Sequence, residues 1–390
     1  MKMLRGAFVI LAVAVLGAGT LLYAFGANVV DQSLNRVLVP GPYQASDEAR
    51  AFYEAHPKVD LHADPLLWDR DLTQRLGHGQ VDFPRLHEAN MTLTVMGIVS
   101  KTPVGQNFDA NPSDSDQLIP LTILNGWPRP TWSSIKARAL HQGANLQAYA
   151  DNSGGEIVFV KSKADLRELL RRRTAGEKVT GTLLALEGMQ PIENDLANLD
   201  DLFAAGVRMG GLSHFFDNEV AGSAHGVDKY GLTELGRATV ARMEELGIVI
   251  DIAHASPKAV DDILATATRP FVVSHTGVKA TCPGNRNLSD DHLRGIAAHG
   301  SVIGISFFAG AVCDASPKGI AKAVAHAVAV AGEDHVSLGS DFDGAVATPF
   351  DVTGMPMLVD AMRAEGLSDP VIAKVLGANA LRVFMAVLPE

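Results

Sequence analysis

The sequence predicts an α/β fold: a closed barrel of eight parallel strands alternating with helices, the (β/α)8 or TIM barrel, preceded by one N-terminal hydrophobic helix. Three observations support this prediction. The chain has 390 residues, of which 47% are hydrophobic and 20% charged, and this fits one large globular domain with a substantial core. Short β-rich runs alternate with helical segments, as parallel βα units require. Several of these runs are continuously apolar, which is typical of strands buried on both faces.

Eight runs are the best candidates for the barrel strands. In chain order they are Val59 to His62, Leu93 to Val99, Gly181 to Leu186, Val207 to Leu212, Ile248 to Ala253, Phe271 to Ser274, Val302 to Phe307 and Val336 to Gly339. A ninth run, Ile157 to Val160, is interpreted as supernumerary. Amphipathic helices are expected between strands, as at 232–246, where apolar residues recur at helical spacing and charges fill the other side. The stretch from Thr102 to Asn152 is either an insertion near the barrel mouth or ordinary surface decoration.

The N-terminal segment differs from the rest of the chain. Lys2 and Arg5 precede an uncharged apolar run from Gly6 to Phe25. A run of about 20 residues is long enough to cross a bilayer and exceeds the usual apolar region of about 7 to 15 residues in a cleaved signal. We favour an uncleaved membrane anchor over a signal peptide cleaved after Gly26. Positive charge ahead of the run places the domain on the extracytoplasmic side, periplasmic or extracellular.

We therefore divide the chain into a signal-anchor or signal peptide at 1–26, a linker at 27–49 and a barrel domain at 50–390. The composition also excludes one class of partner. Lys and Arg number 33 against 44 Asp and Glu, for a net charge of -11, and no basic block occurs, so nucleic acid is not expected to bind. Cys282 and Cys313 are the only cysteines. An exported chain can pair them, and the alternative is two buried free thiols.

Histidine or carboxylate follows six of the expected strands, at the ends where barrels of this type place their catalytic groups. The first strand ends in His62-Ala63-Asp64, and alternation in an extended segment puts both polar side chains on one side. The later strand ends present Glu187, His214, His254, His275 and Asp341. Each residue taken alone is better explained as a hydrogen-bonded core residue or a helix cap. As a set they are ligand types that suit zinc or a similar divalent ion.

Two further polar residues lie beyond the strand ends. Arg286 follows the sixth strand in a loop, where its planar guanidinium could bind a carboxylate through two hydrogen bonds or form a surface salt bridge. His225 lies well past the end of the fourth strand, so we do not expect it to be a metal ligand.

These residues lie in segments that resemble the zinc membrane dipeptidases, also called renal dipeptidases, of the amidohydrolase superfamily. Seven motifs match in the family's order over about residues 59 to 384: VDLHAD, LALEG, GLSHFFDNEVAGSAHG, DIAHAS, VVSHTG followed by NRNLSDD, LGSDFDG and NALRVF. The resemblance implies a binuclear zinc site. It implies that His62 and Asp64 bind one zinc, that His254 and His275 bind the other, and that Glu187 bridges both.

The same resemblance implies roles for the remaining residues. His214 is similar to the family's substrate-side histidine, Arg286 to the arginine that binds the free carboxylate of the substrate, and Asp341 to the carboxylate that handles the proton. Cys282 and Cys313 fall where the mammalian members have a disulfide. Those members carry a C-terminal lipid anchor, whereas this sequence ends at Leu388-Pro389-Glu390 without a hydrophobic tail. The N-terminal apolar run would replace that anchor.

The expected function is hydrolysis of dipeptides by a zinc-dependent metallo-dipeptidase. Two zinc ions that share Glu187 would lower the pKa of a bridging water to about 7 and so supply hydroxide at neutral pH. His214 would donate to the carbonyl oxygen, Asp341 would carry the proton to the departing amine, and Arg286 would restrict the enzyme to dipeptides.

Three alternatives stay open at this point. One is another amidohydrolase reaction on an N-acyl amino acid, lactam or lactone. The second is a non-catalytic anchored metal-binding protein, and the third is a phosphoester hydrolase. The expected partners are a small dipeptide, the membrane through the N-terminal segment, and a second copy of the chain in a homodimer.

Overall fold

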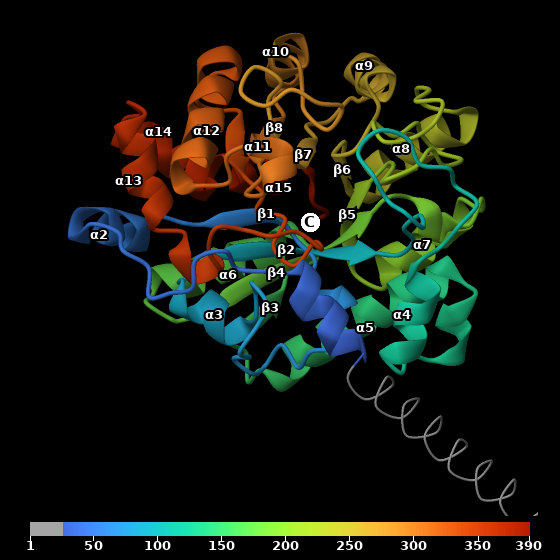
Figure 1. Ribbon diagram of the computed structural model, residues 1–390, viewed down its shortest axis with the longest axis horizontal. Helices are drawn as coiled ribbons and strands as arrows, with labels where there is room; N and C mark the ends of the chain where they lie inside the picture. Colours follow the sequence, from blue (N-terminus) through green and yellow to red (C-terminus); the bar gives the residue numbers. More distant parts are fainter. Residues whose placement is uncertain (1–25) are drawn as a thin grey trace, which may run out of the picture.

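The computed structural model describes residues 26–390, which form a barrel of parallel strands surrounded by helices (Figure 1). The strands are β1 (Val59–Ala63), β2 (Leu93–Val99), β3 (Ile157–Phe159), β4 (Thr180–Glu187), β5 (Val207–Gly211), β6 (Val249–Asp251), β7 (Val272–Thr276), β8 (Val302–Ile305) and β9 (Val336–Leu338). They are hydrogen-bonded in the order β2, β1, β9, β8, β7, β6, β5, β4, β3, and a further pairing of β2 with β4 closes the ring.

The barrel proper has eight strands, because β3 lies outside the ring. It pairs only with the first three residues of β4, from Thr180 to Thr182, and β5 takes up the same edge of β4 from Leu184 onward. The eight predicted barrel strands and the supernumerary ninth are therefore confirmed. In the closed ring β2 and β7 stand four strands apart in either direction, so the loops that follow them lie on opposite sides of the mouth.

Many of the helices begin after a serine or threonine whose side chain caps the first turn. The helices are α2 (Asp47–Ala55), α3 (Phe83–Glu88), α4 (Leu118–Leu124), α5 (Ile135–Asn152), α6 (Lys163–Thr174), α7 (Ala197–Ala204), α8 (Glu234–Leu246), α9 (Pro257–Thr266), α10 (Asp290–Ala298), α11 (Ala309–Val312), α12 (Pro317–Ala331), α13 (Met357–Ala364), α14 (Asp369–Ala373) and α15 (Asn379–Val387). Thr233 caps α8 by accepting a hydrogen bond from the Gly236 amide, and Gly247 ends it in the left-handed conformation.

Shorter helical turns complete the chain. They are the 3-10 turns η1 (Pro65–Leu67), η2 (Arg129–Trp132), η3 (Gln190–Ile192) and η4 (Val352–Gly354) and the π turn η5 (Lys374–Ala378). The π turn joins α14 to α15, and Asp369–Val387 is the stretch of the described residues that is apolar and long enough to cross a membrane. Half of it is buried, and Val383 and Phe384 pack with strand residues of the barrel, so core packing accounts for its apolar character.

The predicted membrane anchor lies almost entirely outside the described residues. Residues 26–34 are helical, and the buried Asp31 carboxylate joins this helix to the barrel. Arg70 Nε lies 3.1 Å from Asp31 Oδ2, and Arg70 Nη2 lies 2.8 Å from Asp343 Oδ2. The Asn35 side chain accepts from the Ala345 amide at 2.8 Å. The stretch expected to act as a linker, 27–49, is thus packed on the rim of the barrel and contains the start of α2.

The Asp31–Arg70 pair should contribute measurably to stability. Breaking a buried pair typically costs about 3 to 5 kcal/mol, and Arg70 would keep Asp343 as a partner. We therefore expect Asp31→Ala to lower the free energy of unfolding by about 2 kcal/mol or more. Urea denaturation measures this change. The exposed Asp114 provides the control, and Asp114→Ala should shift stability by no more than about 0.5 kcal/mol. Equal free energies of unfolding for the two variants would contradict the packing of the N-terminal helix through Asp31.

Candidate active site

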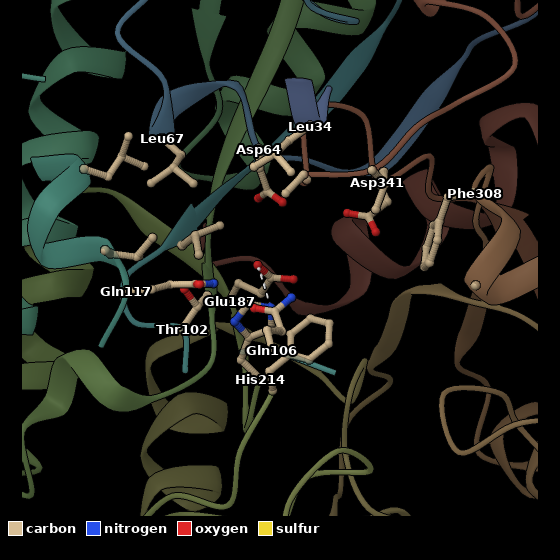
Figure 2. Close-up of a pocket in the computed structure, with 18 of the residues that line it drawn as sticks. Leu34, Asp64, Leu67, Thr102, Gln106, Gln117, Glu187, His214, Phe308 and Asp341 are labelled. Carbon is tan, nitrogen blue, oxygen red and sulfur yellow. Dashed lines mark ion pairs between the residues drawn. The ribbon is translucent and has the colours of Figure 1, made fainter. Parts of the chain in front are cut away.

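The seven residues predicted at the strand ends converge at the C-terminal mouth of the barrel. His62 and His275 lie within β1 and β7, and Glu187 is the last residue of β4. The other members follow the strands directly or by three residues; they are Asp64, His214, His254 and Asp341. All seven are at least nine-tenths buried. Figure 2 shows Asp64, Glu187, His214 and Asp341 pointing into one shared space.

The Glu187 carboxylate is the centre of this group. Its Oε1 lies 3.4 Å from Nε2 of His62, 3.2 Å from Nε2 of His254 and 3.5 Å from Nε2 of His275. Its other oxygen, Oε2, lies 3.3 Å from Nε2 of His214. One carboxylate therefore contacts four imidazoles that come from four different strands.

Two further carboxylates, those of Asp64 and Asp341, lie beside His62. Asp64 Oδ2 lies 3.2 Å from His62 Nε2, and Asp341 Oδ1 lies 4.0 Å from the same atom. The donor atoms of three sets lie within 4.8 Å of one another: His62, Glu187 and His275; Glu187, His214 and His254; and His62, Asp64 and Asp341. His62 links the first set to the third and Glu187 links the first to the second, so the sets form one continuous cluster large enough for more than one ion.

Backbone geometry makes room for this cluster. His254 and Asp341 adopt left-handed backbone conformations, with φ of 63° and 64°. Such conformations cost energy for residues other than glycine and are concentrated at functional sites. Gly97 on β2 has no side chain because a Cβ there would overlap Asp64 Oδ1, and Gly344 likewise avoids Asp341 Oδ1. Sequence reasoning did not single out these glycines, which become significant only when β2 lies beside β1.

Two buried aspartates hold the ligand-bearing strands in place. Asp60 on β1 accepts hydrogen bonds from the Ser340 amide at 2.8 Å and the Ser340 hydroxyl at 2.6 Å. Asp251 on β6 accepts from the Ser274 amide at 2.8 Å and the Ser274 hydroxyl at 2.6 Å. Each aspartate thus ties its strand to a ligand-bearing segment. Sequence reasoning missed both, although Asp60 stands two residues before His62 and Asp251 stands three before His254.

The Ser274 hydroxyl also sets the tautomer of His275. Its hydrogen is donated to Asp251, and its oxygen lies 2.8 Å from His275 Nδ1. The oxygen must therefore accept the Nδ1 hydrogen, and the lone pair of His275 is left on Nε2. That nitrogen faces Glu187 and the cluster, which is the arrangement that metal-binding histidines require.

The electrostatics of the cluster fit a divalent cation. Burial raises the pKa of Glu187 to about 7 and raises the pKa of Asp341 well above its usual value. Burial lowers the pKa of His254 and of His275 well below the ordinary value for histidine. A bound cation would stabilise the charged carboxylates and suits neutral imidazoles. Asp64 Oδ1 is also buried without a hydrogen-bond partner in residues 26–390, so a ligand position is available.

The cluster opens into a cavity of about 810 Å³. Aromatic residues line one side, namely Phe108, Phe215 and Phe308, and aliphatic residues of α4 line the other. The segment from Thr102 to Leu124 contributes to this lining, so the predicted insertion does lie at the mouth. His225 stands behind Phe215, with their ring centroids 4.7 Å apart, and belongs to none of the three donor sets.

Arg286 lies in the cavity wall, where it is 5% exposed. One of its terminal nitrogens, Nη2, donates to the His275 carbonyl, and its Nε has no hydrogen-bond partner within the described part of the chain. Burial lowers the pKa of Arg286, and the nearby Asp341 and Glu187 carboxylates partly offset this effect. The guanidinium therefore lines the cavity, keeps one N–H without a partner among the described residues and supplies positive charge beside the cluster.

Cys282 and Cys313 form a disulfide, with Cα atoms 5.3 Å apart. The bond joins the loop that carries Arg286 to the end of α11, whose residues Ala309 and Gly310 also line the cavity. The disulfide therefore braces two walls of the site against each other.

Comparison with known proteins identifies a family that matches most of this chain. A family model described as "Membrane dipeptidase (Peptidase family M19)" matches residues 46–388. An uncharacterized protein in the pqqA 5' region of Klebsiella pneumoniae is 33% identical over 258 residues, 62% of this chain and 93% of that protein. The dipeptidase verJ of Clonostachys rogersoniana is 32% identical over 249 residues, which span 62% of each chain.

Solved structures agree on the fold. The probable dipeptidase PvdM from Pseudomonas aeruginosa superposes with a TM-score of 0.72 at 21% identity, covering 87% of this chain and 98% of its own. A metallopeptidase from Rhodobacter sphaeroides, whose structure contains a phosphinate mimic of the dipeptide L-Ala-D-Ala, superposes with a TM-score of 0.69 at 24% identity. That match covers 85% of this chain and 99% of the Rhodobacter chain.

The hydrogen bonds that Ser274 forms with Asp251 and His275 generate a prediction about metal binding. Ser274→Ala would free the His275 ring to rotate and to change tautomer, so we expect metal affinity to fall about 10- to 100-fold. Competition titration with a zinc-sensitive chelator measures this affinity. Ser306→Ala is a matched control, because the buried Ser306 hydroxyl has no hydrogen-bond partner among residues 26–390. Unchanged metal affinity in the Ser274 variant would show that these hydrogen bonds do not orient the His275 ligand.

Proposed function

The chain belongs to the membrane dipeptidase family, peptidase family M19, and is a metal-dependent dipeptidase; we propose that it works with two zinc ions held by the strand-end cluster. In this proposal His62 and Asp64 would hold one ion, His254 and His275 would hold the other, and Glu187 would be shared by both. The observation that carries the proposal is the position of Glu187 Oε1, which lies within 3.5 Å of an imidazole nitrogen from each half of the cluster.

Distance alone does not separate His214 from the ligands, because its Nε2 lies 3.3 Å from Glu187. It differs in facing Oε2, whereas the three proposed histidine ligands face Oε1. Burial lowers the pKa of His214 well below its usual value, so the ring is neutral and keeps one N–H. We assign that N–H to the carbonyl oxygen of the substrate, where a donor of this kind contributes about a hundredfold or more in rate.

The ions would lower the pKa of a shared water, so that hydroxide is available at neutral pH. The residues of the chain then act on the reacting groups. Asp341 takes a proton from the attacking water and gives it to the nitrogen of the departing residue as the carbon–nitrogen bond breaks. Its raised pKa suits a group that must accept a proton and release it again. His214 stabilises the negative charge that develops on the carbonyl oxygen.

Arg286 would select dipeptides by binding the free carboxylate of the second residue. The guanidinium is buried beside the cluster, lines the cavity and keeps its Nε hydrogen without a partner among the described residues. A longer peptide has an amide at that position and loses the charge-assisted pair. The presence of a dipeptide mimic in the Rhodobacter sphaeroides structure supports a substrate of this size. The family match disfavours the acylase, lactonase, phosphoesterase and non-catalytic alternatives.

We also propose that the N-terminal segment, residues 1–26, holds the domain of residues 50–390 to the outer side of a membrane. The disulfide between Cys282 and Cys313 supports export, because such bonds persist in oxidising compartments. Homodimer formation stays a prediction.

Metal content tests the two-ion site. Five proposed ligands exceed the three protein ligands that a single open zinc site uses, so full-length protein purified without chelator and supplied with zinc should hold two zinc ions per chain. Elemental analysis against protein concentration gives the ratio. A ratio that never exceeds one would leave a mononuclear site, and activity that survives complete chelation would exclude a catalytic metal.

Arg286 tests carboxylate recognition. A charge-assisted hydrogen bond contributes about 1.5 to 3 kcal/mol, so Arg286→Ala should lower kcat/KM for a dipeptide about a hundredfold or more. Arg286→Lys should recover only part of this loss, because an ammonium cannot form the two-point pair. The bound zinc should stay constant in both variants. The wild type should prefer a dipeptide to its C-terminal amide, and the alanine variant should nearly lose this preference. An equal loss on both substrates would refute the assignment.

A further inference from the structure

The cavity above the cluster has an apolar side that the proposed reaction does not use. Six apolar residues gather on this side, which also carries Thr102 and Gln117 (Figure 2), and we call the six the apolar arm: Val30, Leu67, Trp68, Leu118, Leu121 and Leu124. They come from the N-terminal helix, the segment of η1 and α4. The Trp68 indole N–H donates to the Asp343 carbonyl at 2.7 Å, so the polar atom of this ring is satisfied. The arm therefore offers hydrocarbon surface, and a charged group placed against it would lose its hydration without compensation.

The arm and Arg286 lie on opposite sides of the strand-end cluster of histidines and carboxylates. The η1 and α4 segments follow β1 and β2, and the Arg286 loop follows β7, which stands opposite β2 in the closed ring. Figure 2 shows Leu67 on one side of Glu187 and Phe308 on the other. Consecutive Cα atoms are only about 3.8 Å apart, so a dipeptide whose carboxylate is at Arg286 has its scissile bond near Glu187. Its first residue must then lie toward the arm.

We propose that the apolar arm binds the side chain of the first residue of the dipeptide and selects a large aliphatic or aromatic group there. This inference rests on the proposed dipeptidase function and deepens it. The volume of about 810 Å³ leaves room for a large side chain beside the dipeptide backbone. The N-terminal helix takes part in the selection through Val30, since the ion pair of Asp31 with Arg70 holds this helix against the rim.

Dipeptide kinetics test the inference. The zinc-loaded, full-length protein in detergent is assayed with Leu-Ala, Ala-Ala and Lys-Ala, each prepared with L- and D-alanine as the second residue. We expect kcat/KM for Leu-Ala to exceed that for Ala-Ala by about tenfold or more, a range that apolar pockets reach for a few additional carbon atoms. Lys-Ala should be the poorest of the three, because its ammonium group would be desolvated in the arm.

Matched variants on α4 test whether the preference for Leu-Ala comes from the apolar arm. Leu121→Asn keeps a branched side chain of similar size but makes it polar, so it should lower kcat/KM for Leu-Ala about tenfold more than for Ala-Ala. Ile123→Asn is the control, because Ile123 lies on the same helix, is 38% exposed and does not line the cavity. It should leave both values within about twofold. Zinc content should be unchanged in both variants.

A second pair of variants keeps the test valid if the Leu121 variant misfolds. Val30 is 38% exposed and lines the cavity, whereas Val29 is 64% exposed and does not. Val30→Asn should therefore reduce the preference for Leu-Ala, and Val29→Asn should not. Equal kcat/KM for Leu-Ala and Ala-Ala in the wild type, or equal losses on both in the folded Leu121 and Val30 variants, would overturn the inference alone. Failure of the zinc-loaded wild type to hydrolyse any of the dipeptides would instead overturn the proposed function.

Discussion

The buried carboxylate of Glu187 is the constraint on which the rest of the site depends. Glu187 ends β4, and pairing with β2 up to Glu187 itself and with β5 up to Leu186 fixes its backbone. Its oxygens lie within 3.5 Å of imidazoles from four strands. A charge at this depth is tolerated only with partners that compensate the lost hydration. The surrounding histidines and a divalent cation are suited to provide that compensation.

The barrel stabilises this concentration of polar groups through a second layer of hydrogen bonds. Asp60 and Asp251 each accept two amide hydrogen bonds and one from a serine hydroxyl. These bonds connect β1 to the segment after β9, and β6 to β7, so that neighbouring ligands keep a constant separation. The His275 tautomer follows from the same network. Precise ligand placement therefore depends on residues that never face the cavity.

An ion-pair network and a disulfide, which join segments far apart in the sequence, hold the walls above the cluster. Arg70 bridges Asp31 and Asp343, and so attaches the N-terminal helix to the loop after β9. The disulfide attaches the Arg286 loop to α11. Loops usually tolerate more motion than the strands that carry them, and these two ties restrict that motion where the substrate must be held. The floor is thus fixed by strand pairing, and the walls are fixed by one ion-pair network and one covalent bond.

The sequence by itself determined the eight barrel strands and the residues at their ends, because a continuous apolar run followed by histidine or carboxylate marks both a buried strand and a polar mouth. It also predicted the supernumerary strand and the cysteine pair. It could not reveal the supporting role of Asp60 and Asp251, the clearance provided by Gly97, or the packing of residues 26–34 on the rim. These depend on which strands become neighbours and which loops become opposite, as β2 and β7 do. Only closure of the ring, a tertiary event set by long-range strand pairing, decides those relations.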